Sequence, residues 1–221
     1  MFYRDARHVY RAGRLECLSW LEHGFGTRHA GAWVDGAVAS LRQVHSDRCV
    51  YAGGRTGCLG EGDALISDRP GQWLVIRTAD CLPVLFADQR LKAVAAAHAG
   101  WRGTVRQIAA RTVEALGTRF GSRPEDLVVA IGPGICAACY SVGPEVARQF
   151  EPWFPERIDL EHSARIDLAE ANRRQLLAAG VPEGNIVAGA PCTACRPEEF
   201  FSHRRNPAKA SRMVSAIGIR A

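Results

Sequence analysis

Three short apolar runs are the feature that most constrains how this chain can fold. They cover residues 74–76, 84–86 and 94–97, and glycine, proline or polar residues end each of them. Runs of this length with such boundaries are typical of buried strands rather than helices. The polar segments TADCLP (78–83) and AHAGWRG (97–103) therefore place an Asp, a Cys, a His and an Arg at the ends of core strands. A rigid scaffold can hold reactive side chains at such positions.

Composition sets broad limits on the class of protein. A chain of 221 residues with 47% hydrophobic residues predicts one domain, spanning 1–221, with an ordinary core. The N-terminal residues carry charges where a signal peptide needs an apolar run, so we expect no signal peptide, and no run approaches the roughly 18 apolar residues of a membrane span. We therefore expect a cytoplasmic protein without a membrane partner, in which the eight cysteines are thiols or ligands rather than disulfides. The net charge of +5 favours an anionic ligand only slightly and does not indicate nucleic-acid binding.

Two long helices are predicted from their boundary residues. Thr104 and Gln107 form a capping-box pattern before an amphipathic stretch to residue 116, and Asp167 with Glu170 precedes a second stretch that ends at Gly180. The remaining predictions are a hairpin within residues 8–18, a strand over 41–51 that carries His45, and strands at 127–131, 185–188 and 213–219.

His45, Cys81 and His98 belong to three different expected strands. Two imidazoles and one thiolate suit zinc and leave the fourth tetrahedral position free for water. On the residues alone, a hydrogen-bonded core or loop residue is the more common role for each histidine. Cys81 with His98 could instead be a nucleophile and its base, although Asp80 would not orient that histidine, because neighbours on a strand point to opposite faces.

The cysteines also form two CxxC pairs that are a rival metal site. Cys136 and Cys139 make one pair, Cys192 and Cys195 make the other, and 52 residues separate the pairs. A zinc ribbon has roughly 15–20 residues there. Each pair follows a proline-containing turn, so the pairs could still converge on a structural zinc ion. A redox dithiol is less favoured, because neither pair opens a thioredoxin-like unit.

Six blocks of sequence resemble one known family. They are QVHSD (43–47), GDALIS (62–67), TADCLPVLF (78–86), AAAHAGWRGT (95–104), AIGPGI with CYSVGPEV (130–146), and CTAC with FFSHRR and SRMVSAI (192–217). In this order they are similar to the laccase-domain family, also called the YfiH-like polyphenol oxidase family. The resemblance implies an α+β fold, a layered sandwich of mixed β-sheets flanked by helices.

The resemblance also implies a zinc enzyme that acts on purine nucleosides. Members are described as phosphorylases of adenosine, inosine, guanosine and methylthioadenosine, and as adenosine deaminases. Some are linked to peptidoglycan precursor editing, and the older name reflects copper-dependent phenol oxidation. The family's metal ligands fall on His45, Cys81 and His98, with zinc as the expected cofactor and copper as the alternative. The family's cysteines near Tyr140 and at Cys192 are not its ligands, so we expect the CxxC pairs to be structural thiols without metal.

Two reactions would use this site differently. Zinc lowers the pKa of water to about 7, which suits attack on purine C6 in deamination. Phosphorolysis needs cations for phosphate and a proton for the leaving base. We expect Cys81, His98 and Arg102 to be catalytic residues, and we expect a monomer or homodimer. The residues expected to bind nucleoside and phosphate are Arg28, Gln43, Phe201, His203, Arg204 and Arg205.

Three other functions stay open on the sequence. Cys81 and His98 could serve a cysteine amidase, and the chain could be a zinc protein without activity. A multicopper oxidase is weaker, because it needs many histidines and only three of the seven lie in the matching motifs. The segment between Arg28 and Gln43 has fourteen residues, fewer than is usual in the family, which bears on substrate range.

Overall fold

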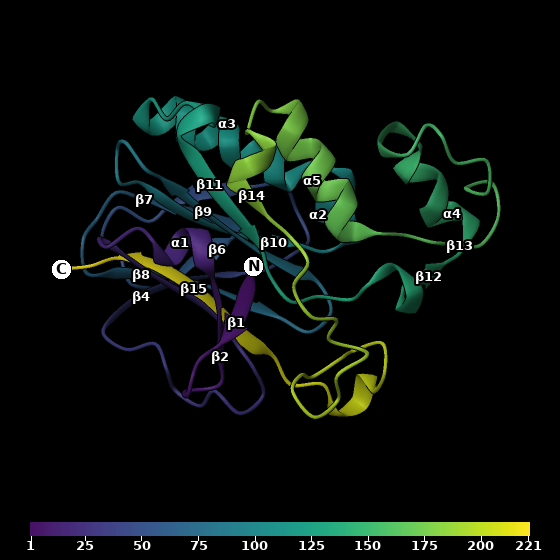
Figure 1. Ribbon diagram of the computed structural model, residues 1–221, viewed down its shortest axis with the longest axis horizontal. Helices are drawn as coiled ribbons and strands as arrows, with labels where there is room; N and C mark the ends of the chain where they lie inside the picture. The colour runs from purple at the N-terminus through teal and green to yellow at the C-terminus, as the bar shows by residue number, and fades with distance from the viewer.

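Two β-sheets lie face to face, and helices cover the outer face of one of them (Figure 1). The computed structural model describes all residues, 1–221. The seven-stranded sheet has the order β1 (Phe2–Arg4), β2 (Val9–Ala12), β3 (Leu21–Gly26), β15 (Met213–Ile219), β8 (Gln72–Thr78), β4 (Ala37–Arg42), β6 (Gly57–Glu61). The six-stranded sheet has the order β14 (Ile186–Val187), β11 (Leu127–Ile131), β9 (Leu82–Asp88), β10 (Val94–Ala99), β7 (Ala64–Ser67), β5 (Cys49–Tyr51). Both sheets mix parallel and antiparallel pairs, which confirms the predicted layered α+β architecture.

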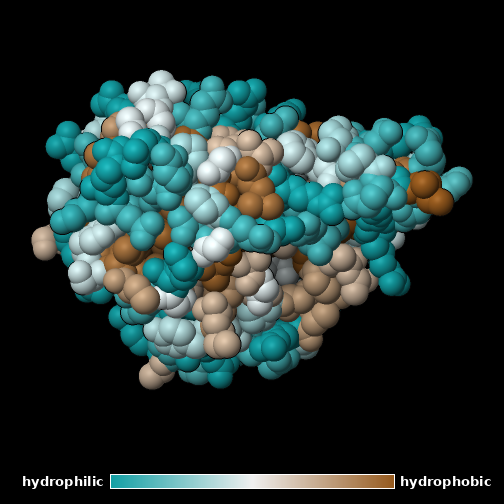
Figure 2. All heavy atoms as spheres, turned by 45° about the horizontal axis from the view of Figure 1, so that its top comes forward, coloured by the Kyte–Doolittle hydropathy of each residue, from teal (hydrophilic) through white to brown (hydrophobic).

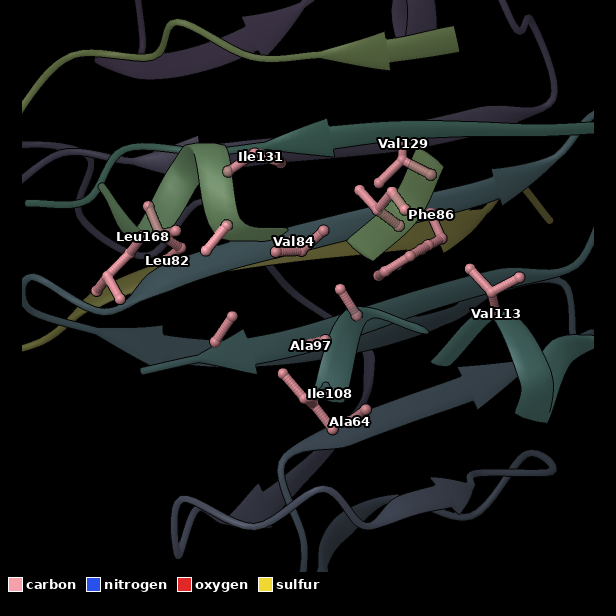
Figure 3. Close-up of a cluster of buried hydrophobic side chains, with 14 of the residues drawn as sticks. Ala64, Leu82, Val84, Phe86, Ala97, Ile108, Val113, Val129, Ile131 and Leu168 are labelled. Carbon is pink, nitrogen blue, oxygen red and sulfur yellow. The ribbon is translucent and has the colours of Figure 1, made fainter. Parts of the chain in front are cut away.

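The six-stranded sheet is buried on both faces, and its apolar runs explain why. All residues of β9 are buried, and successive side chains point to opposite faces of a strand. Val84 and Phe86 pack under the helices, as Figure 3 shows, whereas Leu85 and Ala87 pack against the other sheet. Such continuous hydrophobic strands are what a sheet covered on both sides requires.

The helical layer differs from the prediction at its start. The helices are α1 (Gly13–Glu16), α2 (Trp101–Val105), α3 (Ile108–Phe120), α4 (Pro144–Ala147) and α5 (Leu168–Ala178). The predicted capping box is wrong, because Gln107 adopts a left-handed conformation (φ 65°) that separates α2 from α3. Thr104 lies inside α2, and its buried hydroxyl accepts a hydrogen bond from Asn172 of α5 at 3.0 Å. A tertiary contact therefore uses the hydroxyl that the local pattern assigned to a cap.

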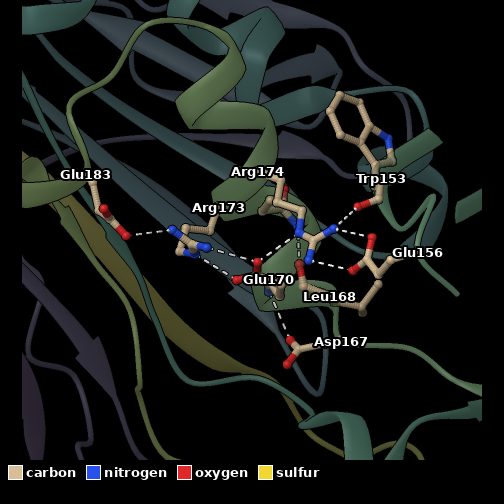
Figure 4. A network of polar contacts seen from close by, with 9 residues as sticks. Trp153, Glu156, Asp167, Leu168, Glu170, Arg173, Arg174 and Glu183 are labelled. Carbon is tan, nitrogen blue, oxygen red and sulfur yellow. Dashed lines mark hydrogen bonds and ion pairs between the residues drawn. The ribbon is translucent and has the colours of Figure 1, made fainter. Parts of the chain in front are cut away.

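The predicted cap of the last helix is confirmed. The Asp167 carboxylate accepts a hydrogen bond from the Glu170 backbone N–H at 2.9 Å, directly before α5. Figure 4 shows how ion pairs then fasten this helix to the segment that holds α4. Glu170 accepts from both Arg173 and Arg174, and Arg174 also bonds Glu156. This projecting segment is closed by the short pair β12 (Ser141–Val142) and β13 (Ala164–Arg165).

Several strand predictions are confirmed and two need correction. Strands β11 and β15 match the predicted ranges, and β14 lies within residues 185–188. The hairpin is formed by β1 and β2, so it precedes the predicted position, and residues 13–16 are helical. The strand predicted over 41–51 is broken into β4 and β5. The break contains His45 at φ 60°, a conformation that no β-strand accommodates.

The surface is mostly hydrophilic on the face drawn in Figure 2, where strongly hydrophobic residues occur as small separate groups. None of the helices has both the length and the apolar character needed to cross a bilayer.

A buried histidine predicts how stability depends on pH. His23 on β3 is 1% exposed, and its Nε2 accepts a hydrogen bond from the Ala12 N–H at 2.9 Å. Burial, with a smaller effect of the Arg11 charge, lowers its pKa to about 3. Because the unfolded chain binds this proton near pH 6.5, stability is complete above that pH and falls as the pH drops toward 3.

We expect the free energy of unfolding to fall by on the order of 3 kcal/mol between pH 7 and pH 4 through this residue alone. Urea unfolding at both pH values should show this loss in the wild type but not in His23→Gln. The exposed His162→Gln is the control. An equal pH dependence in His23→Gln and the wild type would contradict the expectation.

Candidate metal centre

Three side chains from separate segments converge at one edge of the six-stranded sheet. The ligand atoms of His45, Cys81 and His98 all lie within 4.8 Å of one another. His45 belongs to the turn after β4, Cys81 to the turn between β8 and β9, and His98 to β10. The two imidazole rings meet edge to face, with centroids 4.9 Å apart. The structure thus brings together the three residues that the family motifs singled out.

Strand pairing explains why Cys81 meets the end of β10. In the antiparallel ladder of β9 and β10, Ala99 faces Leu82, so the residues beyond them, Gly100 and Cys81, are also adjacent. A Cβ on Gly100 would lie 2.8 Å from Cys81 Sγ and 3.1 Å from His45 Cδ2. Glycine is therefore required there for the thiol and the imidazole to share this space.

Asp63 holds two of the three ligands in place through hydrogen bonds with His98 and with the backbone of His45. The sequence alone did not assign it a role. Its carboxylate is wholly buried and accepts a hydrogen bond from His98 Nδ1 at 2.8 Å. It also accepts the backbone N–H groups of Val44, His45 and Ser46 and the Ser46 hydroxyl. Burial alone would raise the pKa of this carboxyl group, but the hydrogen bonds from His98 and Ser46 outweigh burial and lower it to about 2. The GDALIS block, with an aspartate before a buried strand, was the available signal.

Contacts with neighbouring groups favour the charged forms of Cys81 and His98. Burial would raise the pKa of the Cys81 thiol, but hydrogen bonds with His45 and His98 outweigh burial and lower it to about 6. Burial would lower the pKa of His98, yet Asp63 and Cys81 raise it to about 9. Since Nδ1 of His98 is engaged by Asp63, Nε2 is the nitrogen left to bind a metal.

Two cavities meet at the ligands His45 and Cys81, and His98 lines one of them. A cavity of about 350 Å³ is lined by polar and basic side chains that include Gln43, Arg77 and Arg212. A cavity of about 310 Å³ contains the aromatic rings of Trp101 and Tyr140. His45, Cys81 and His203 line both cavities. Sequence reasoning missed Arg77, Arg212, Trp101 and Tyr140, because nothing local distinguishes them from other strand-end and loop residues.

Asp80 points away from the metal ligands and anchors a loop. Its buried carboxylate accepts the hydroxyls of Thr193 at 2.6 Å and Ser202 at 3.1 Å, and the Arg204 N–H at 2.7 Å. The orientation agrees with the expectation that Asp80 does not orient the histidine beside Cys81. His203 lies between two of these contacts, which places it at the rim of both cavities.

Besides Cys81 and His98, four of the predicted substrate and catalytic residues lie at the cavities. Arg102 and Arg204 line the aromatic cavity, with guanidinium carbons 4.4 Å from the Trp101 ring centroid and 5.1 Å from that of Tyr140. His203 faces both cavities. The Gln43 amide lines the polar cavity but exchanges two hydrogen bonds with the backbone of Arg77.

Arg28, Phe201 and Arg205 have structural partners instead and line neither cavity. Arg28 bonds the Pro197 carbonyl and lies over the Phe201 ring at 4.8 Å. Arg205 donates to the backbone carbonyls of Thr193, Ala194 and Phe200. Their guanidinium groups and ring therefore support the loop rather than face the metal centre.

Comparison with known proteins shows the family to which this chain is similar. A family model described as multi-copper polyphenol oxidoreductase laccase matches residues 27–220. The purine nucleoside phosphorylase of Deinococcus radiodurans is 42% identical over 186 residues, which are 82% of this chain and 70% of that protein. The adenosine deaminase RL5 from an unknown prokaryotic organism is 38% identical over 191 residues, covering 80% of this chain and 72% of that protein.

A solved structure extends the likeness to the whole fold. The crystal structure of YlmD from Geobacillus stearothermophilus superposes with a TM-score of 0.90 at 30% identity, covering 100% of this chain and 99% of that chain. The matches to the purine nucleoside phosphorylases of Bacteroides thetaiotaomicron and Geobacillus stearothermophilus each span 60% of those proteins. Since the family model matches most of the residues and the relatives named are enzymes, the chain belongs to the laccase-domain family, described as multi-copper polyphenol oxidoreductase laccase.

Proposed function

We propose that this protein is a zinc-dependent purine nucleoside phosphorylase that cleaves adenosine, inosine, guanosine or methylthioadenosine with phosphate. The observation that carries the proposal is the convergence of His45, Cys81 and His98 where two cavities meet. The relatives named purine nucleoside phosphorylase support the same reaction.

The three donor side chains, His45, Cys81 and His98, suit a zinc ion. A thiolate and two imidazoles are zinc ligands of a catalytic type, and Asp63 supplies the outer carboxylate that fixes a metal-binding histidine. The absence of a Cβ on Gly100 leaves the space in which the Cys81 thiol and the His45 ring come close. When bound, zinc supplies a Lewis acid with an open coordination position.

The side chains of the aromatic cavity suit a nucleoside and phosphate. Arg102 and Arg204 carry guanidinium groups that can hold phosphate by charge-assisted hydrogen bonds, and the rings of Trp101 and Tyr140 give the purine an aromatic surface. A phosphate oxygen then bonds to ribose C1′ while the C1′–N9 bond breaks and its electrons pass to the purine. We assign His203 to hold the proton that the leaving base takes up.

Adenosine deamination is the second candidate, because the relative named adenosine deaminase aligns over 80% of this chain. Attack on C6 of adenine needs the base, not the ribose, beside Cys81 and the two histidines. Two poses of one nucleoside, with opposite ends in the two cavities, would allow both reactions at one site.

The geometry also contains the parts of a cysteine hydrolase. Cys81, His98 and Asp63 follow one another as nucleophile, base and orienting carboxylate. A hydrolase of this kind would give His45 no role, whereas in a metal site His45 is the third ligand. A multicopper oxidase is not supported, because only two clusters in the chain could hold a metal and they contain just two histidines.

The deciding test is whether release of free base from inosine or adenosine depends on phosphate. The proposal expects free base and ribose 1-phosphate only when phosphate is present, and loss of both after chelation. A cysteine hydrolase would ignore phosphate, survive mild chelation and lose activity to a thiol alkylator. Base release without phosphate would refute the phosphorylase assignment.

Removing one guanidinium should weaken phosphate binding specifically. We expect Arg102→Ala to raise KM for phosphate and lower kcat/KM by about ten- to a hundredfold, the value of a charge-assisted contact of roughly 1.5–3 kcal/mol. Zinc content should not change, since Arg102 is not a ligand. Steady-state kinetics with phosphate as the varied substrate measures the effect.

The control is Arg111→Ala, an exposed arginine on α3 that pairs with Glu114 away from the cavities. It should behave as the wild type. An unchanged KM for phosphate in Arg102→Ala would remove this residue from the proposed phosphate site.

A further inference from the structure

The two CxxC pairs, far apart in sequence, form one compact cluster. The sulfur atoms of Cys136, Cys139, Cys192 and Cys195 all lie within 4.8 Å of one another. Cys195 Sγ is 3.4 Å from Cys139 Sγ and 3.9 Å from Cys136 Sγ. Four sulfurs around one zinc ion, each at about 2.3 Å in tetrahedral geometry, are about 3.8 Å apart. The spacing fits shared ligation and exceeds the roughly 2 Å of a disulfide.

Backbone contacts bring the two pairs together without any help from a metal. Gly134 and Cys192 form a parallel β-bridge, and the Thr193 N–H donates to the Gly134 carbonyl at 3.0 Å. A Cβ on Gly134 would meet the Asp80 carbonyl at 2.9 Å, so this turn packs directly on the segment before Cys81. The Cys136 N–H donates to Cys192 Sγ at 3.2 Å. Such bonds to sulfur are the outer contacts that orient metal-binding thiolates.

The donor set identifies the class of cation. Four thiolates with no histidine or carboxylate are typical of a closed, tetrahedral zinc site that stabilises structure rather than performing catalysis. Three of the cysteines are partly buried and Cys195 is exposed, so an ion has access to the cluster.

We infer that Cys136, Cys139, Cys192 and Cys195 bind a structural zinc ion, separate from the His45, Cys81 and His98 site. This replaces the expectation of metal-free thiols, which rested on the family resemblance and not on the position of the sulfur atoms. The inference does not depend on the proposed function, because it concerns different ligands.

The four cysteines lie in position to stabilise the loop beside the His45, Cys81 and His98 site. From β14 to the 3-10 helix at Pro207–Lys209 the chain forms no helix or extended strand. Thr193, inside the second CxxC pair, bonds the Asp80 carboxylate, and Arg205 bonds the carbonyls of Thr193 and Ala194. A zinc ion would therefore fix the loop that carries His203 and Arg204 to the cavities.

Metal analysis tests this directly. Protein purified without added metal should contain two zinc ions per chain, measured by elemental analysis and native mass spectrometry. The pair Cys136→Ser with Cys195→Ser should retain one zinc, Cys81→Ala should retain one, and the combined variant none. Cys17→Ser with Cys58→Ser, both exposed and outside the clusters, should keep two.

Two further measurements keep the test decisive if the serine variants fold poorly. X-ray absorption on zinc in Cys81→Ala should show four sulfur neighbours at about 2.3 Å. Titration of the wild type with a mercurial should release both zinc ions. The serine pair should also lower Tm and speed tryptic cleavage after Arg204 or Lys209, which the Cys17 and Cys58 control should not do.

One zinc per chain in the wild type, lost completely in Cys81→Ala, would overturn the inference. So would a disulfide within the cluster, seen as a mass two hydrogens lower per bond, or iron in place of zinc. None of these outcomes bears on phosphate-dependent turnover, so this inference and the proposed function can fail separately.

Discussion

Cys81→Ala is expected to abolish phosphate-dependent cleavage of nucleosides and to remove the metal held with His45 and His98, with little loss of fold. The ligand lies in a turn at the end of β9, outside the packed strand interior. Two imidazoles alone are a poor zinc site, so affinity should fall by more than the 10–100-fold typical of losing an outer contact. Losing several kcal/mol of charge stabilisation corresponds to a fall in kcat on the order of a thousandfold or more.

Zinc content, steady-state turnover and urea unfolding of the same preparation measure the three expectations. Cys49→Ala is a useful comparison, because this partly buried thiol contacts Thr112 of α3 and lies outside both cysteine clusters. It should keep its metal and turnover. If Cys81→Ala retained all the wild-type zinc, the assignment of Cys81 as a ligand would be wrong.

Replacing Asp63 should damage both the fold and the metal site. Asp63→Ala removes the acceptor of His98 Nδ1, of three backbone N–H groups and of the Ser46 hydroxyl. Because these donors are left buried without partners, we expect a loss of about 3–5 kcal/mol in the free energy of unfolding. Metal affinity should fall by about 10–100-fold through the freed His98 ring.

The milder substitution Asp63→Asn keeps one oxygen acceptor and removes the charge. It therefore separates the effect of the carboxylate charge from the effect of its hydrogen bonds. Since the carboxyl pKa is about 2 in the folded protein, its stabilisation is present above pH 4 and is lost as the pH falls toward 2. Asp63→Asn should lack that acid-sensitive part of the stability. Urea unfolding across this pH range and competition with a chelator measure the two effects.

Asp88 provides a matched control for Asp63. It is also a wholly buried carboxylate, but it ends β9 at the edge of the sheet away from Cys81 and caps a turn through Arg90 and Leu91. Asp88→Asn should change stability and leave metal affinity unaltered. If both variants bound zinc as the wild type does, Asp63 would have no special role at the metal centre.

Phosphate dependence remains the measurement that separates the enzyme classes. The same three residues, Cys81, His98 and Asp63, fit either a metal ligand set or a hydrolase triad, and only His45 favours the first. The Cys81→Ala variant is inactive in both readings. The effects of chelation and of phosphate on turnover by the wild type are therefore more informative than the loss of activity in the variant.

Elements whose signals are local could be predicted from the sequence. Continuous apolar runs identify β9, β10 and β11, because a strand covered on both faces must be hydrophobic at every position. The cap at Asp167 is likewise a contact between residues three apart, which a sequence pattern can encode. The grouping of His45, Cys81 and His98 came from the family motifs, since nothing in their spacing requires it.

The tertiary structure alone decided the features that depend on contacts across the chain. Asp63 gains its role from two distant segments, residues 44–46 and His98, that donate to one carboxylate, and Thr104 exchanges a local cap for a contact with α5. Strand register sets Cys81 beside Gly100, and one backbone bridge brings together cysteines 56 residues apart. Local patterns carry the period of a strand or helix, but the path of the backbone between elements fixes which side chains finally meet.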